Sequence, residues 1–176
     1  MRRAAARGAG WDRGARAAAA AALAAVALGA WAPPARAQAP ATTDVLVDAR
    51  VLPDGRVAVT VDRAVAFADA SSAPMRLSIP LEGAAGAEIL EVGEPGRHYR
   101  PTGGDAPHSY ALDEGPDEVV VRWGVEAAAG ETRRFIVTYL LDGAIDVDPR
   151  GDALSRTLLP PGEAAASATV RVAVPP

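Results

Sequence analysis

The sequence predicts an all-β protein: a single immunoglobulin-like antiparallel β-sandwich of about eight or nine strands, preceded by a signal-peptide helix. Valine-rich segments alternate apolar and polar residues with the period of two that is typical of strands. Turn-forming Gly, Pro and Asp separate these segments at intervals of about 8–12 residues. In the mature part, the one helical candidate is a single turn at Glu163–Ser167.

Residues 1–37 have the three parts of a secretory signal peptide. Arginines precede an alanine-rich apolar run at Ala17–Ala32, and Ala35–Ala37 supplies small residues at the cleavage site. We expect cleavage near Ala37 and a mature chain that is secreted or periplasmic, that is, extracytoplasmic. An uncleaved anchor is the alternative, but this apolar run is shorter than the roughly 20 residues that span a bilayer. Sec and twin-arginine export both stay open.

The first two strands are predicted to form a hairpin. A polar linker at residues 38–43 precedes a domain that we expect to span residues 44–176. Asp44–Leu52 and Arg56–Phe67 both carry valines at alternate positions. The Pro-Asp-Gly sequence between them favours a tight turn, because Pro presets φ and Gly accepts positive φ.

The segment Glu118–Leu141 is predicted to be the central hairpin of the domain. Residues 119–125 and 135–141 each alternate in the manner of a strand, and Gly130 and Glu131 lie between them. Trp123 falls on the apolar face of the first run. We therefore assign it to the core rather than to a sugar-stacking platform.

Five further strands complete the prediction, and one of them contains a proline. Pro80 indicates that Met75–Leu81 lies at a sheet edge or ends there. Asp44–Leu52 and Met75–Leu81 are our candidates for strand pairing with another chain, because edge strands expose unpaired backbone groups. The other strands are Ala87–Val92, Ser109–Leu112, Ala153–Leu159 and Ser167–Val174, with His98–Arg100 extended and Ala144–Gly151 a loop.

The composition excludes several kinds of site. The chain has no cysteine, so it forms no disulfide, no thiolate metal site and no lipoprotein anchor, and it has no cysteine nucleophile. It also has no lysine, so all 18 basic residues are arginine. From residue 38 onward, 12 arginines and 21 acids give a formal charge of −9. This acidity argues against nucleic acid as a partner, which requires clustered positive charge.

Four aspartates form the candidate metal site. Residues 146–151 match the opening Asp-x-Asp-x-x-Gly of a calcium loop. Arg150 stands at the fifth position, where an oxygen ligand belongs, and Thr157 stands at the twelfth in place of a bidentate glutamate. Two interpretations therefore remain: a weak extracellular calcium site, or an acidic loop that binds no ion. The candidate ligands are Asp142, Asp146, Asp148 and Asp152.

We expect no catalytic residues and no cofactor. His98 and His108 lie in a Gly- and Pro-rich region without recognised metal-ligand spacing, and they are expected to be exposed loop residues. There is no Gly-x-Ser-x-Gly motif to present a serine nucleophile. The acids at Asp113–Glu118 flank a Gly-Pro turn, as is common for solvated carboxylates.

The order of several segments resembles a known bacterial family. The segments are "VLVDARVLPDGRVAVTVDRAVAF", "LSIPL", "GETRRFIVTYLLDGAI", "ALSRTLLP" and "ATVRVAVPP". Together they resemble the extracytoplasmic N-terminal domain of the predicted membrane proteins called domain of unknown function 2207. The resemblance implies an exported β-sandwich and supplies no catalytic residue. Members of that family usually continue into membrane helices, whereas this sequence stops at Pro176, as a free secreted version or a severed ectodomain would.

These observations favour a non-catalytic binding or interaction module, or ectodomain, of the cell envelope, whose partner is an unknown protein or envelope component. We expect no enzyme and no membrane span in the mature chain. A carbohydrate- or calcium-binding adhesion module is the alternative. An acid-catalysed hydrolase that uses the carboxylates near Asp113–Glu118 and Asp142–Asp152 is the less favoured one.

Overall fold

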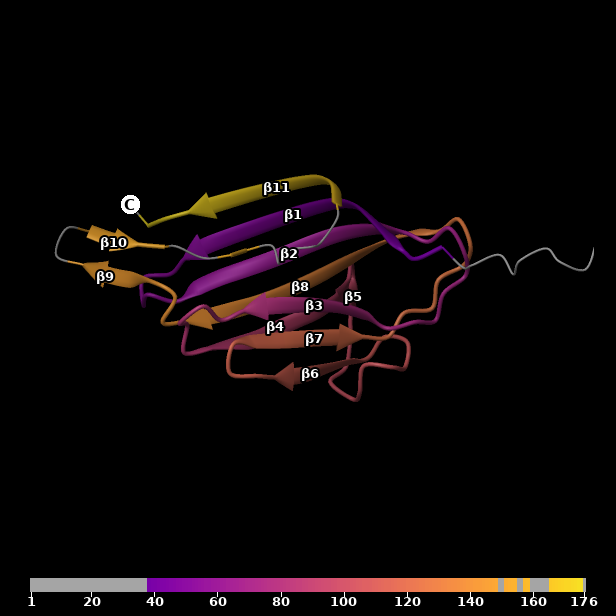
Figure 1. Cartoon of the computed structure of the whole chain (residues 1–176), viewed down its shortest axis with the longest axis horizontal. Coiled ribbons are helices and arrows are strands. Elements are labelled where there is room, and N and C mark those ends of the chain that lie inside the picture. The colour runs from indigo at the N-terminus through magenta and orange to yellow at the C-terminus, as the bar shows by residue number, and fades with distance from the viewer. Residues whose placement is uncertain (1–37, 149–150, 155–156, 159–164, 176) are drawn as a thin grey trace, which may run out of the picture. The chain divides into compact units, whose positions relative to one another are not determined.

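The described part of the chain is all-β, as predicted, and forms a two-layered sandwich (Figure 1). The structure, a computed structural model, describes residues 38–148, 151–154, 157–158 and 165–175. These belong to the compact unit Ala37–Pro176, and the predicted signal peptide lies outside them. The strands are β1 (Ala41–Val51), β2 (Val57–Ala66), β3 (Met75–Pro80), β4 (Gly86–Glu94), β5 (Arg97–His98), β6 (Tyr110–Glu114), β7 (Glu118–Trp123), β8 (Thr132–Asp142), β9 (Asp146–Asp148), β10 (Gly151–Ala153) and β11 (Ala165–Ala173).

Two sheets of unequal width make up the sandwich. The larger has six strands in the order β11-β1-β2-β8-β4-β5, and the smaller has three in the order β3-β7-β6. A two-stranded ribbon, β10-β9, completes the described strands. No helix within these residues is long and apolar enough to cross a membrane.

The predicted hairpin at the start of the domain is confirmed. β1 and β2 pair antiparallel, from Ala41 opposite Ala66 to Val51 opposite Val57. The turn closes with Leu52 N–H donating to the Arg56 carbonyl at 2.8 Å. Gly55 adopts φ +82°, which is the positive value that the turn requires of this position.

The predicted central hairpin is wrong, because its two strands lie in different sheets. β7 pairs with β3 and β6, whereas β8 pairs with β2 and β4. The intervening segment crosses from one layer to the other, and Ala127 forms a bridge with Ser71 on the way. A strand with one apolar face shows the period of two whether the next strand pairs with it in the same sheet or packs against it from the other sheet. The period therefore does not distinguish these two arrangements.

The edges of the sheets differ in part from the prediction. Met75–Leu81 is an edge strand as predicted, because β3 ends the three-stranded sheet. Asp44–Leu52 is not, because β11 pairs with the outer side of β1. This β1–β11 pair is parallel, so the sandwich is not wholly antiparallel.

Two smaller predictions also need correction. Part of the expected loop Ala144–Gly151 forms β9, which pairs antiparallel with β10. The sequence predicts a strand at Ala153–Leu159, but the observed strand β10 spans Gly151–Ala153, and residues 154, 157 and 158 lie outside any strand. Residues 155, 156 and 159 lie outside the described part. Ser167, the last residue of the single-turn helix candidate, belongs to β11. Residues 163–164 lie outside the described part.

The core fills the space between the two layers with alternate residues of each strand. Trp123 is fully buried, as predicted, and its ring lies 5.7 Å from that of Phe135. The core-facing residues of β2 follow the predicted period of two. The buried side chains of the first two strands are Val45, Val47, Ala49, Val57, Val59, Val61, Arg63 and Val65.

Candidate functional site

β11 presents apolar side chains that the second layer does not cover. In the parallel register, Val47 lies opposite Val170 and Ala49 opposite Val172, so all four lie on the core-facing side of the sheet. Val47 and Ala49 are buried, whereas Val170 is 48% exposed and Val172 is 54% exposed. The smaller sheet lies over the part of the larger sheet that holds β8 and β4, away from β11 (Figure 1).

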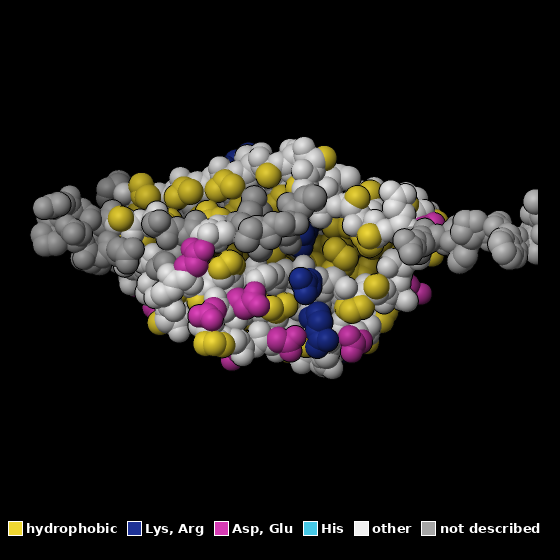
Figure 2. All heavy atoms as spheres, viewed as in Figure 1, with side chains coloured by type: hydrophobic (Ala, Val, Ile, Leu, Met, Phe, Trp, Pro, Cys, Tyr) yellow, Lys and Arg dark blue, Asp and Glu magenta, His cyan; other side chains and the backbone are white. Residues whose placement is uncertain are grey.

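These side chains lie at alternate positions along one side of the strand, and we call them the β11 apolar row. Figure 2 shows hydrophobic side chains along the margin where Figure 1 places β11. Of five large hydrophobic side chains that are exposed in the described part, three belong to this row. An exposed apolar strip of this kind typically marks an interaction surface. The row consists of Ala168, Val170, Val172 and Val174.

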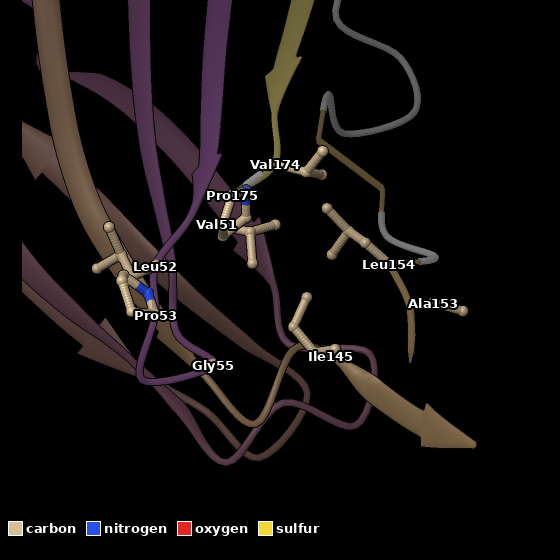
Figure 3. A pocket seen from close by; sticks show the side chains of 9 residues that line it. All are labelled: Val51, Leu52, Pro53, Gly55, Ile145, Ala153, Leu154, Val174 and Pro175. Atoms are coloured by element: carbon tan, nitrogen blue, oxygen red, sulfur yellow. The ribbon is translucent and has the colours of Figure 1, made fainter. Parts of the chain in front are cut away.

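An apolar groove continues the row at the C-terminal end of β11 (Figure 3). It has a volume of about 640 Å³. The side chains of Val51, Ile145 and Leu154 converge on it from the end of β1 and from either side of the β9–β10 ribbon. Leu52, Pro53, Gly55, Ala153, Val174 and Pro175 complete the lining.

The outer backbone edge of β11 carries few of the features that usually block strand pairing. Natural edge strands are typically protected by proline, by lysine or other charges, or by bulges. The nine residues of β11 include no proline and one charge, Arg171. Arg171 lies opposite Asp48 of β1 in the register, so the strand pair is formally neutral there.

A second, polar hollow lies where β4, β5 and the start of β8 meet. Its volume is about 500 Å³. Arg133 forms a salt bridge with Glu94 and donates to the main-chain carbonyl of Glu126, and the hydroxyl of Tyr99 also donates to Glu94. Burial, followed by this bond to Glu94, raises the pKa of Tyr99. The side chains of Arg133 and Glu94 are only 10% and 18% exposed, so the network chiefly links strands to each other.

The two histidines do not come together at this hollow. His98 is exposed and its Nδ1 lies 3.0 Å from Glu91 Oε1. His108 is half-buried and packs edge-on against Tyr99, with ring centroids 5.5 Å apart. Its Nε2 lies 2.6 Å from Arg97 Nη1.

The four candidate metal ligands fall around the β9–β10 ribbon. Asp142 ends β8 and is exposed, and its main-chain carbonyl accepts from Ala85 N–H at 2.8 Å. Asp146 and Asp148 belong to β9 and Asp152 to β10, but their side chains lie outside the described part. Among the residues that the structure describes, no three or more His, Asp or Glu side chains lie close enough to hold a metal ion.

The acids of the β6–β7 turn have separate neighbours. Asp113 Oδ2 lies 3.6 Å from Arg122 Nε, and the Ser78 hydroxyl donates to Glu118. Asp113 and Glu118 are both exposed.

One core residue was missed by the sequence analysis. Arg63 lies on the valine face of β2, is 4% exposed and donates from Nη1 to the Arg76 carbonyl at 3.1 Å. Arg63 belongs to the larger sheet and Arg76 to the smaller, so this bond joins the two layers. The sequence does indicate burial here, because in a strand Arg63 falls on the same face as Val61 and Val65.

Comparison with known proteins identifies no family. No protein-family model and no curated protein matches this sequence. The solved structures that are similar include an M1 zinc metallopeptidase of Deinococcus radiodurans bound to a Tyr-Ser-Ala substrate, with 18% identity and a TM-score of 0.44. That match covers 78% of this chain and 33% of the other. A second M1 zinc metallopeptidase structure from the same organism matches at 14% identity and a TM-score of 0.36, covering 64% and 22% respectively. The chain thus spans about a third or less of these structures.

Proposed function

We propose that this protein is an exported, non-catalytic interaction module of the bacterial cell envelope, which binds an extended segment of a partner protein along β11. Two observations on one strand carry this proposal: among the described strands β11 ends its sheet, and its apolar row is about half exposed. Strand addition uses both features, because main-chain hydrogen bonds give affinity and alternate side chains give specificity.

The apolar row supplies the driving force for such binding. Val170 and Val172 are each about half exposed, so a partner that covers them gains about 1 kcal/mol per valine from the hydrophobic effect. The groove beside Val51, Ile145 and Leu154 offers space for a larger apolar side chain at one end of the added strand. The partner segment is therefore an alternating, largely uncharged strand.

The sequence pattern of residues 1–37 supports the envelope location, since it has the parts of a signal peptide. The resemblance to domain of unknown function 2207 is in keeping with this location. The acidic balance of the remaining chain favours a protein partner over a nucleic acid.

In-cell photo-crosslinking tests this function. A photoreactive amino acid replaces Val172 in the full-length protein in its own host, and Leu112 is the matched control, being 37% exposed on the other sheet. We expect an adduct with a protein chain at position 172 and none at 112. The further substitution Val170→Lys in the same chain should abolish the adduct. Equal adducts at both positions, or none at either, would contradict the proposal.

A further inference from the structure

We propose that the strand added to β11 is β11 of a second copy of this chain, paired antiparallel about a two-fold axis at Thr169. This inference rests on the proposed function, because it identifies the partner of the same edge. The two six-stranded sheets would then form one continuous sheet, with both β11 apolar rows on the same side.

The distribution of charge favours a second copy at this edge. The chain from residue 38 onward carries a formal charge of −9, so two copies repel each other overall. β11 has no acidic residue, and its one cation, Arg171, lies opposite Asp48 in the β1 register. The β11 edge is therefore a place where two copies approach without facing acids.

The side-chain pattern of β11 limits the registers in which two copies can pair. Residues that lie directly opposite each other in a sheet point to the same side, so a shift of one residue would place the two apolar rows on opposite faces. A two-fold axis at Arg171 would place two arginines directly opposite, which is destabilising. An axis at Thr169 avoids both problems.

The Thr169 register also pairs the whole strand. All nine residues from Ala165 to Ala173 then have a partner, whereas any other centre leaves residues of the strand unpaired. Val170 lies opposite the partner's Ala168, so large and small side chains alternate along the joined apolar rows. The two Thr169 residues face each other, which is a favourable cross-strand pair.

The absence of cysteine makes this register directly testable by disulfide formation. Directly opposite residues in an antiparallel pair have Cα atoms about 4.5–5.5 Å apart, within the range of a disulfide. We expect the full-length protein with Thr169→Cys, purified as the cell exports it, to form a disulfide-linked dimer under mild oxidation. Val172→Cys is the matched control. In this register its two copies lie six residues apart along the strand, about 20 Å, and should stay unlinked.

Sedimentation of the unsubstituted protein provides the second measurement. We expect a reversible dimer, and we expect Val170→Lys to abolish it, because it places a charge in the joined apolar rows. Leu112→Lys should leave the dimer intact. Circular dichroism confirms that each variant is folded. A protein that stays monomeric at every concentration, or a Val172→Cys link that forms faster than the Thr169→Cys link, would overturn the inference.

The two proposals fail in different ways. A monomeric protein that nevertheless crosslinks from position 172 to a different protein in cells would overturn the second-copy inference and leave the proposed function in place. A protein that forms neither contact would overturn both.

Discussion

The ring of Trp123 lies 5.7 Å from the ring of Phe135, at an angle of 50°, although the two residues belong to different sheets. Trp123 ends β7 in the smaller sheet, and Phe135 lies in β8 of the larger one. The chain crosses between the layers over the few residues that separate these strands. This aromatic contact therefore joins the two layers close to the crossing.

We expect Trp123→Ala to reduce the free energy of unfolding by about 3–5 kcal/mol, since it leaves a large cavity between the layers. Trp123→Phe should cost less. It keeps most of the ring contact and removes an indole N–H that has no hydrogen-bond partner within the described structure. Urea denaturation followed by circular dichroism measures both. The exposed Leu112→Ala is the control, with a change within about 0.5 kcal/mol. An equally small change for Trp123→Ala would show that the layers do not pack through this residue.

Glu94→Gln should destabilise the fold by about 2–3 kcal/mol, because it removes the less exposed of two carboxylates near the largely buried Arg133 and leaves only Glu131 Oε1, 3.9 Å from Arg133 Nε. The matched control is Glu91→Gln on the same strand. Its side chain is 34% exposed and faces the highly exposed His98, so its loss should cost about 0–1 kcal/mol. Chemical denaturation at neutral pH distinguishes the two. Similar values for both variants would mean that the Glu94–Arg133 pair contributes no more than a surface pair.

Gly124→Ala should destabilise the protein by about 1–3 kcal/mol through a backbone clash. A Cβ at this position would lie 2.0 Å from the Ala106 carbonyl oxygen, in a loop that packs against the end of β7. Gly86→Ala is the control, since a Cβ there would meet no atom within 4 Å. Thermal melting of both variants tests the difference. If Gly124→Ala melts like the control, the loop does not approach β7 this closely.

Stability should fall as the pH rises above about 10, the ordinary pKa of tyrosine. Burial raises the pKa of Tyr139, and burial together with the bond to Glu94 raises that of Tyr99. Both phenols therefore stay protonated in the folded state and release protons on unfolding, which favours the unfolded state in alkali. The chain has no lysine or cysteine to titrate in this range, so the effect can be assigned to tyrosine.

Tyr139→Phe should therefore unfold at a higher pH than the unsubstituted protein, as measured by circular dichroism across an alkaline titration. The same substitution should change stability little at neutral pH. If Tyr139→Phe and Tyr99→Phe both unfold at the same pH as the parent, the two phenols are not protected from ionisation in the folded state.

Sequence patterns predicted which residues form strands better than they predicted which strands are neighbours. The valines of β2 alternate as expected and are buried as expected, because period and burial are local properties of a strand. The pairing of β7 with β3 and β6 depends instead on how distant segments divide between two layers. The parallel return of β11 beside β1 is also a long-range property, and it removed the expected free edge of β1.

The candidate site was visible in the sequence only in part. The alternation of Val170, Val172 and Val174 places them on one face, but their exposure depends on the width of the opposing sheet. For Arg63 two sequence features disagree. Its position on the valine face of the strand indicates burial, whereas its charge indicates exposure. Its long side chain reaches the Arg76 carbonyl and so satisfies part of its hydrogen-bonding capacity inside the sandwich.

Amide hydrogen exchange of β11 tests the central claim, that this strand is an edge where another strand adds. The full-length protein is compared at its lowest and highest soluble concentrations, with β2 as the internal reference because it lies inside the larger sheet. The second-copy arrangement predicts that the alternate β11 amides that point away from β1 exchange rapidly in dilute solution and are markedly protected in concentrated solution. The β11 amides that bond to β1 and those of β2 should change little. Exchange along β11 that is equally fast at both concentrations would contradict it.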